Sequence, residues 1–368
     1  MDYRYWVAFN LVKGIGPTKV RWLLDHFGDL ADAWRASPEE LRAAGLDRRS
    51  LDNLLTARHS IDLDRVLKRI ELAGVRVLTW EDPDYPRNLL NIPQPPPVLY
   101  VKGQLTAADE WAVAIVGTRH ATNYGREAAR ELGAALAYSG VTVVSGLARG
   151  IDAVAHKAAL DAGGRTIAVL GSGLDQIYPP EHHALAEAIT PAGALVSDYP
   201  LGTQPEGLNF PPRNRIISGL SKGVVIVEAG EGSGALITAD YAAEQGRDVF
   251  AVPGSIFVRT FRGTNKLIQQ GAKLVLSVSD ILEELNLTLV TEHKETRAVF
   301  PADPTEQRLL ACLSAEPVHV DDLGVQVGLP IAQITGTLAL MELKGLVRQV
   351  GGMNYVVARE ARADYRVE

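Results

Sequence analysis

The chain has 368 residues, of which 46% are hydrophobic. This composition supplies enough apolar material for two or three packed domains and excludes a disordered chain. The formal net charge of −7 argues against a general polyanion binder, so any nucleic-acid site has to be a local basic patch.

Membrane, secretion and metal signals are weak. No apolar run approaches the roughly 18 residues that a membrane span needs, and the first ten residues lack the basic-then-apolar order of a signal peptide. The single cysteine, Cys312, cannot form an internal disulfide, and no Cys/His cluster has zinc-site spacing. We therefore expect a cytoplasmic protein with no membrane partner and no metal site.

Residues 1–75 are predicted to form a small helical domain, because apolar residues recur at helical spacing over residues 20–27 and 63–70. Between two amphipathic stretches lies the sequence KGIGP, Lys13 to Pro17. In a helix-hairpin-helix such a glycine turn offers backbone N–H groups to a phosphate. A tight helix–helix turn accounts for the same residues equally well.

A proline-rich connector over residues 82–97 should be extended or turn-like, because proline disfavours helix there. After it, continuous apolar runs alternate with helical segments. The strand-like runs are 112–116, 141–144, 166–170, 194–196, 224–227 and 249–252, and the helical segments include 127–138, 153–161 and 236–245. Runs without polar alternation are typical of strands buried on both faces. The fold class is therefore α/β, with a Rossmann-like, doubly wound and mostly parallel sheet over residues 76–286.

A charged stretch ending in prolines, residues 287–304, is predicted to be an interdomain linker. Residues 305–368 then show three helical segments and a hairpin around Gly351 and Gly352, the order of a winged helix-turn-helix. Its second main helix, 331–343, has no basic residue before Lys344, so major-groove reading is disfavoured and contact with a protein is the better hypothesis.

Glycine-rich loops follow four of the predicted strands. Ligands of open parallel sheets bind beyond the carboxyl ends of the strands, and a helix that starts there offers free N–H groups. The loop residues that we expect to form a phosphate-binding cradle are Gly117, Thr118, Arg119, Ser145, Gly146, Arg149, Gly150, Gly232, Ser233 and Gly234, with Gly171 to Gly173 following a further strand.

The segment FPPRNRII adds Arg213, Asn214 and Arg215 at the expected start of a helix. Both arginines stand among apolar neighbours, where an unpaired charge is costly, and guanidinium groups suit bidentate phosphate contacts. We expect them to complete the phosphate site together with Arg119. Solvated arginines on a surface helix are the alternative.

A catalytic interpretation rests on Asp152 and His156, four residues apart on one predicted helix, and on Glu228 at the end of a strand. Asp152 also suits a helix cap, and His156 can pair with it. The sequence contains no P-loop, and no dinucleotide fingerprint follows the first strand at residues 112–116, so no cofactor is expected.

Six segments of the chain together resemble one family: GTRHATNYG, SGLARGIDAVAH, GSGLDQIYP, FPPRNRIISGLS, EAGEGSGALITA and AVPGS. They occur in the order seen in the DNA-processing protein A family, also called Smf, and the resemblance covers nearly the whole chain. It implies a helical domain like a sterile alpha motif, an extended Rossmann domain and a winged helix. By motif matching, the family's G-[ST]-R element falls on Gly117, Thr118 and Arg119, and its RNR element on Arg213 to Arg215.

The resemblance also implies a function. Members of the family are non-enzymatic binders of single-stranded DNA that protect incoming strands, act as homodimers and help to load the RecA recombinase in natural transformation. The family is similar to the Lonely-guy nucleotide hydrolases, so a nucleotide-monophosphate hydrolase is the alternative function. Here Thr238 stands where those hydrolases have their catalytic Glu, which weakens that alternative. A third hypothesis is an adaptor that recruits a partner through its winged helix.

Overall fold

The structure is a computed structural model that describes residues 3–287, 304–313, 317–343, 347–350 and 352–357. It divides into two compact units, Met1–Leu287 and Thr288–Glu368, which are considered separately below. Residues 288–303 of the predicted linker lie outside the described residues, and so does Lys344.

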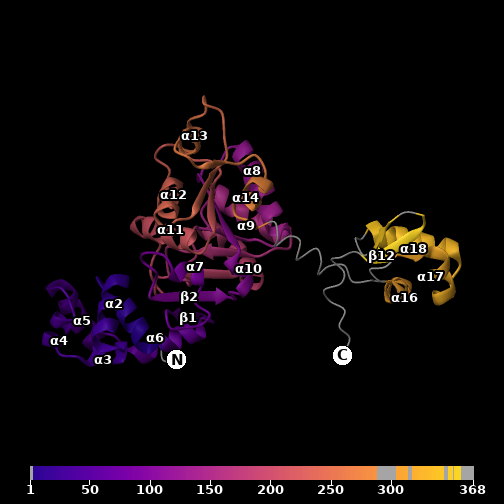
Figure 1. The fold of residues 1–368 in the computed structure, drawn as a ribbon. Helices are drawn as coiled ribbons and strands as arrows, with labels where there is room; N and C mark the ends of the chain where they lie inside the picture. Colours follow the sequence, from indigo (N-terminus) through magenta and orange to yellow (C-terminus); the bar gives the residue numbers. More distant parts are fainter. Residues whose placement is uncertain (1–2, 288–303, 314–316, 344–346, 351, 358–368) are drawn as a thin grey trace. The chain divides into compact units, whose positions relative to one another are not determined.

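The first unit begins with a run of helices (Figure 1). They are α1 (Arg4–Asn10), α2 (Pro17–Phe27), α3 (Leu30–Arg35), α4 (Pro38–Ala43), α5 (Arg48–Ser60) and α6 (Leu63–Leu72). Side chains of Asp29, Ser37, Asp47 and Asp62 cap four of them by accepting hydrogen bonds from backbone N–H groups. The KGIGP segment forms the turn between α1 and α2, where Gly14 has a φ of +91°.

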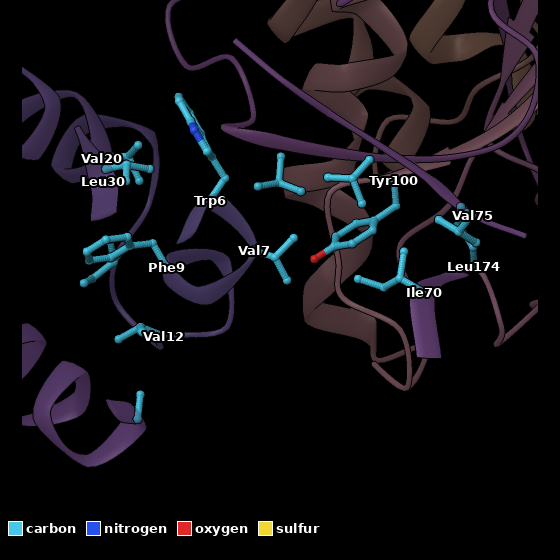
Figure 2. Close-up of a cluster of buried hydrophobic side chains, with 14 of the residues drawn as sticks. Trp6, Val7, Phe9, Val12, Val20, Leu30, Ile70, Val75, Tyr100 and Leu174 are labelled. Atoms are coloured by element: carbon cyan, nitrogen blue, oxygen red, sulfur yellow. The ribbon is translucent and has the colours of Figure 1, made fainter. Parts of the chain in front are cut away.

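The helices pack against the sheet through a shared hydrophobic cluster (Figure 2). Trp6, Val7 and Phe9 of α1 are buried in it together with Tyr100 of the sheet. The Tyr100 hydroxyl donates a hydrogen bond of 3.0 Å to Asn10, which reinforces the apolar contact. The helical region and the sheet thus share one core, although the sequence presents them as separate patterns.

The sheet has nine strands in the order β1-β2-β6-β5-β4-β3-β7-β8-β9. The strands are β1 (Arg76–Thr79), β2 (Val98–Gly103), β3 (Ala112–Val116), β4 (Thr142–Ser145), β5 (Thr166–Val169), β6 (Ala194–Ser197), β7 (Gly223–Ile226), β8 (Asp248–Ala251) and β9 (Lys273–Leu274). All neighbours are parallel except β1 with β2 and β2 with β6. This confirms the predicted mostly parallel, Rossmann-like sheet.

Helices cover both faces of the parallel strands (Figure 1). They are α8 (Asn123–Tyr138), α9 (Ile151–Asp161), α10 (His183–Ala192), α11 (Phe210–Gly219), α12 (Gly234–Glu244), α13 (Arg262–Gln269) and α14 (Val278–Glu284). Helix α9 packs against α8 and α10, whereas α11 packs against α12. The connector differs from the prediction, because the short helix α7 (Arg87–Leu90) starts directly after Pro86, a position where proline is tolerated.

The second unit is a winged helix with its own core. It contains α16 (Pro304–Cys312), β10 (Val318–His319), α17 (Val320–Val327), α18 (Ile331–Leu343), β11 (Val347–Gln349) and β12 (Asn354–Val357). Leu309, Leu323, Ile334 and Leu338 are buried together in this core. The three predicted helices and the hairpin are confirmed.

Within the described ranges, no single helix has both the length and the hydropathy to cross a membrane. One pair reaches them together, Val320–Val327 with Ile331–Glu342, and that pair is bent by 110°.

Candidate nucleic-acid interface

The sheet has a topological switch point between β3 and β7. From β3 the chain winds outward through β4, β5 and β6, and it then returns to place β7 on the other side of β3. The loops after β3 and β7 therefore diverge and leave a crevice at the carboxyl edge of the sheet. A pocket of about 580 Å³ occupies this place.

Seven of the residues predicted from the sequence line this pocket: Gly117, Thr118, Arg119, Arg213, Asn214, Ser233 and Gly234. Gly146 and Arg149 line a small hollow of about 20 Å³ that shares Arg119 and Arg213 with the pocket. The structure does not bring Ser145, Gly150, Arg215 or Gly232 to either lining. The glycine-rich loops therefore do converge, but not every residue in them faces the crevice.

Arg119 is the exposed cation of the pocket. Its guanidinium carbon lies 5.5 Å from the centre of the Phe210 ring, and among the described residues it has no ion pair or hydrogen bond. An arginine stacked on an aromatic ring keeps its N–H edges free for an anion. Arg119 is thus oriented by the fold and open to a ligand.

Two aromatic rings line the pocket beside Arg119. Phe210 and Tyr178 lie with their ring centres 5.7 Å apart at an angle of 33°. Phe210 packs closely on Gly171, because a Cβ on that glycine would lie 2.8 Å from the ring. The glycine after β5 therefore serves the placement of Phe210, and both half-buried rings present surface to the pocket.

Arg213 lines the pocket as predicted, but it is also held within the fold. Its side chain is buried, and Nη1 donates to the carbonyl oxygens of Gly146, at 2.9 Å, and Val169. Burial lowers the pKa of Arg213 to about 10, while nearby Asp152 acts in the opposite direction. Arg213 reaches the pocket wall, but its main hydrogen bonds tie the loop after β4 to the last residue of β5.

Arg215 turns away from the pocket. Its Nη2 forms an ion pair of 2.6 Å with Asp198, its Nη1 donates to the Gln94 carbonyl, and both charged side chains are largely buried. The predicted phosphate contact through Arg215 is therefore not supported by its position. The sequence signal, an arginine among apolar neighbours, arose from a buried ion pair.

Fewer backbone N–H groups are free to bind a ligand than the glycine-rich loops suggested. The Thr118 N–H donates to the Glu228 carbonyl at 2.7 Å, and the Gly146 N–H donates to Asp152 at 3.1 Å. Those of Arg119 and Gly234 donate no hydrogen bond among the described residues. Gly234 is the first residue of α12, so the N-terminus of that helix is open toward the pocket.

The other loop residues have structural roles. The Ser145 hydroxyl donates to the Ile115 carbonyl at 2.6 Å, and Arg149 pairs with Glu181 at 2.5 Å on the surface. Gly150 has a φ of +77°, and a Cβ there would lie 2.3 Å from the Thr118 carbonyl oxygen. Gly150 thus permits the close approach of the loop that carries Arg119.

The three residues of the catalytic interpretation are buried, and of the three only Asp152 is part of the pocket lining. Asp152 accepts hydrogen bonds from the N–H groups of Gly146 and Ala148, and burial raises its pKa. His156 bonds through Nδ1 to Thr166 at 2.7 Å, and burial lowers its pKa to about 3. Glu228 accepts two hydrogen bonds of 2.9 Å from Thr122.

His120 and Thr238 also line the pocket, and the sequence analysis did not assign them to the phosphate site. His120 directly follows Arg119 in the loop after β3, so its position beside a predicted ligand residue was the available signal. Thr238 is buried on the first turns of α12.

Fold and site together define a Rossmann-like protein with an open, arginine-lined crevice at its switch point, followed in the chain by a winged helix. The family model for DNA recombination-mediator protein A matches residues 76–286, and a model for the DprA winged helix domain matches residues 293–353. The chain belongs to the DNA recombination-mediator protein A family.

Comparisons with individual relatives support this family membership. A protein named Smf from Synechocystis is 39% identical over 96% of this chain and 98% of its own length. The crystal structure of DNA processing protein A from Streptococcus pneumoniae is 37% identical and covers 76% of this chain and 97% of its own, with a TM-score of 0.69. A structure of DNA processing protein A from Helicobacter pylori, reported for its binding mode of single-stranded DNA, is 30% identical over 57% of this chain and 96% of its own, with a TM-score of 0.52.

Proposed function

We propose that this chain is a non-enzymatic recombination mediator that binds single-stranded DNA in the switch-point pocket. The observation that carries the proposal is Arg119, an exposed guanidinium that has no ion pair among the described residues and stacks on Phe210 at the mouth of the crevice. In a chain with a net charge of −7, such a cation is suited to a phosphate group.

The pocket offers separate partners for the backbone and for the bases. Arg119 and the N–H groups of Arg119 and Gly234 are free for phosphate oxygens. Tyr178, whose ring adjoins that of Phe210, provides ring surface on which a base can stack, while Phe210 carries the Arg119 guanidinium. Because stacking and phosphate contacts do not discriminate between bases, we expect little sequence preference.

The positions of Asp152, His156 and Glu228 support binding rather than hydrolysis. His156 and Glu228 are buried and are not part of the pocket lining, whereas Asp152 lines the pocket but accepts hydrogen bonds from the N–H groups of Gly146 and Ala148. A general base has to reach a reacting proton within hydrogen-bond distance, directly or through one water. Thr238 stands where the related hydrolases have their catalytic Glu and is itself buried.

The proposal includes the partners that the family resemblance implies. The bound strand would be handed to the RecA recombinase in the cytoplasm, during natural transformation or other recombination. A homodimer is consistent with strand β9, which is an outer strand of the sheet and is followed by an exposed leucine, Leu276.

The test is fluorescence anisotropy with a labelled single-stranded oligonucleotide, across a salt series and with duplex competitor. We expect salt-sensitive single-strand binding that Arg119→Ala weakens by about 10-fold or more, as for a charged hydrogen bond worth roughly 1.5–3 kcal/mol. Arg119 is exposed, so the variant should fold normally.

Lys102→Ala provides the matched control. Lys102 is an exposed cation on β2 at the opposite edge of the sheet, where its register partner is Leu195 near the start of β6. Its removal should leave affinity unchanged. Equal losses in both variants, or normal binding by Arg119→Ala, would contradict the assignment of the pocket.

A further inference from the structure

A second feature of the carboxyl edge is an exposed apolar loop between β8 and α13. Phe257 at its tip is 89% exposed and Ile256 is 72% exposed. The segment that enters α13 projects from the end of the domain (Figure 1). Ile256, Phe257 and Val258 are consecutive and all exposed, and such a contiguous apolar patch is typical of an interaction site.

The base of this loop is firmly held. Phe261 is buried against Gly254, where a Cβ would lie 2.1 Å from its ring, and the Tyr124 ring packs edge-on to Phe261 at 5.5 Å. The Tyr124 hydroxyl donates to the Pro253 carbonyl at 3.0 Å. Asn265 donates to the Gly254 carbonyl at 2.9 Å and accepts from its N–H at 3.2 Å. The tip is therefore presented by a built support.

The loop adjoins the pocket. The Gly263 N–H donates to the Ala229 carbonyl at 2.8 Å, and Gly230 lies against the Arg259 backbone. From Gly230 a single turn, closed by the Ser233 N–H at 3.0 Å, leads to Ser233 and Gly234 of the pocket wall. The loop between β8 and α13 therefore lies beside the part of the pocket wall that Ser233 and Gly234 form.

The charges of the loop suit a nucleic acid. The segment 253–266 contains Arg259, Arg262 and Lys266 and no carboxylate, and all three cations are exposed. None of the three has an ion pair among the described residues. Exposed aromatic surface flanked by free cations is the combination by which single-stranded nucleic acids are bound without base readout.

We propose that the loop between β8 and α13 is a second subsite for the same DNA strand, on which a base outside the pocket stacks against Phe257 while Arg259 and Arg262 contact the flanking phosphates. This inference rests on the proposed function, because it extends the strand that the pocket binds. It adds a stacking residue that lies outside the pocket and next to it.

The experiment compares single-stranded oligonucleotides of about four and about twelve nucleotides, lengths that span the usual range of single-strand sites. Phe257→Ala should weaken binding of the longer oligonucleotide by about 5-fold or more, as stacking residues do, and should leave the shorter one unchanged. Arg259→Ala with Arg262→Ala should reduce the salt dependence for the longer oligonucleotide only. Phe257→Trp should retain the affinity, whereas Phe257→Leu should not.

Tyr138→Ala is the matched control. Tyr138 is an aromatic residue that is 80% exposed at the C-terminal end of α8, a helix that starts at the carboxyl edge and ends at the opposite one. It should bind both oligonucleotides normally. An abasic nucleotide at the stacked position should cost the wild type the same factor as Phe257→Ala and should cost that variant nothing more.

The outcomes separate the two proposals. If Arg119→Ala binds both oligonucleotides with normal affinity, the pocket is not the DNA site. If Arg119→Ala loses affinity for both oligonucleotides and Phe257→Ala loses affinity for neither, the pocket assignment stands and the second subsite is refuted. The Phe257 side chain is 89% exposed, so we expect Phe257→Ala to fold normally. A change of sedimentation with no length-dependent loss of affinity would show that the loop instead contacts a second copy, and that also refutes the subsite.

Discussion

At the scale of single residues, the two arginines that face the pocket have different tasks. Arg213 is buried, bonded to two carbonyls and adjacent to Asp152, whereas Arg119 is exposed. Arg213→Ala removes the buried hydrogen bonds to the Gly146 and Val169 carbonyls and the favourable charge near Asp152, which together should cost about 3–5 kcal/mol in the free energy of unfolding. Denaturant titration checks this, and Arg119→Ala should unfold like the wild type. Restored stability in Arg213→Ala with Asp152→Ala would show that the loss comes from the orphaned charge.

His156 makes the stability of the protein depend on pH. Burial lowers its pKa from 6.5 to about 3, so the folded protein keeps it neutral while the unfolded chain binds a proton below pH 6.5. Its contribution is complete above pH 6.5 and is lost as the pH falls toward 3, by about 2 kcal/mol at pH 5. Urea titrations at pH 7 and pH 5 should show this loss in the wild type and a smaller loss in His156→Gln. Equal losses in both proteins would mean that other groups carry the pH dependence.

The sequence predicted several of the residues that gather at the switch point, whereas the DNA contacts that it assigned to them stay predictions. Glycine after a parallel strand indicates the carboxyl edge whatever the glycine is for, so Gly117 and Gly234 were correctly expected there. Whether an arginine pairs internally depends on residues distant in the chain. Asp198 lies 17 residues before Arg215, and no local pattern announces that ion pair.

At the scale of secondary structure, the central strands could be predicted from local sequence patterns and the outer strands could not. Strands β3 to β8 were predicted because each is an apolar run buried on both faces or nearly so. Strand β9 has only two residues, which is too short for a pattern, and β2 follows a run of prolines. Strand β1 is as long as β4 to β8, but it begins with the exposed Arg76 and was not predicted. Their existence depends on pairing with distant neighbours, which the local sequence does not encode.

The outer strand β9 is the edge at which we expect dimerisation. Leu276, just beyond it, is 78% exposed, and the strand pairs on one side only, with β8. If this edge forms the homodimer, Leu276→Asp should weaken dimerisation about 10- to 100-fold, since a buried leucine contributes about 1.5–3 kcal/mol. Sedimentation velocity over a concentration series measures the effect. Leu72→Asp, at an equally exposed leucine on α6, is the control that should leave the dimer intact.

At the scale of the whole molecule, the two units have separate cores. The buried clusters of the first unit are built from residues up to Leu287, whereas the winged-helix core uses residues from Leu309 onward. Every residue that we assign to DNA lies in the first unit. In the second unit, α18 contains no basic residue, and the hydroxyls of Thr335 and Thr337 donate to carbonyls of their own helix.

A chain that ends at Leu287 should therefore fold and bind single-stranded DNA with the affinity and salt dependence of the full chain. Anisotropy titrations of both chains across a salt series make the comparison, because the slope reports how many phosphates are neutralised. A shallower slope after truncation would mean that the winged helix contributes cations to the DNA. An unchanged slope would leave it free for the role that its acidic and apolar surface suits better, which is contact with a protein.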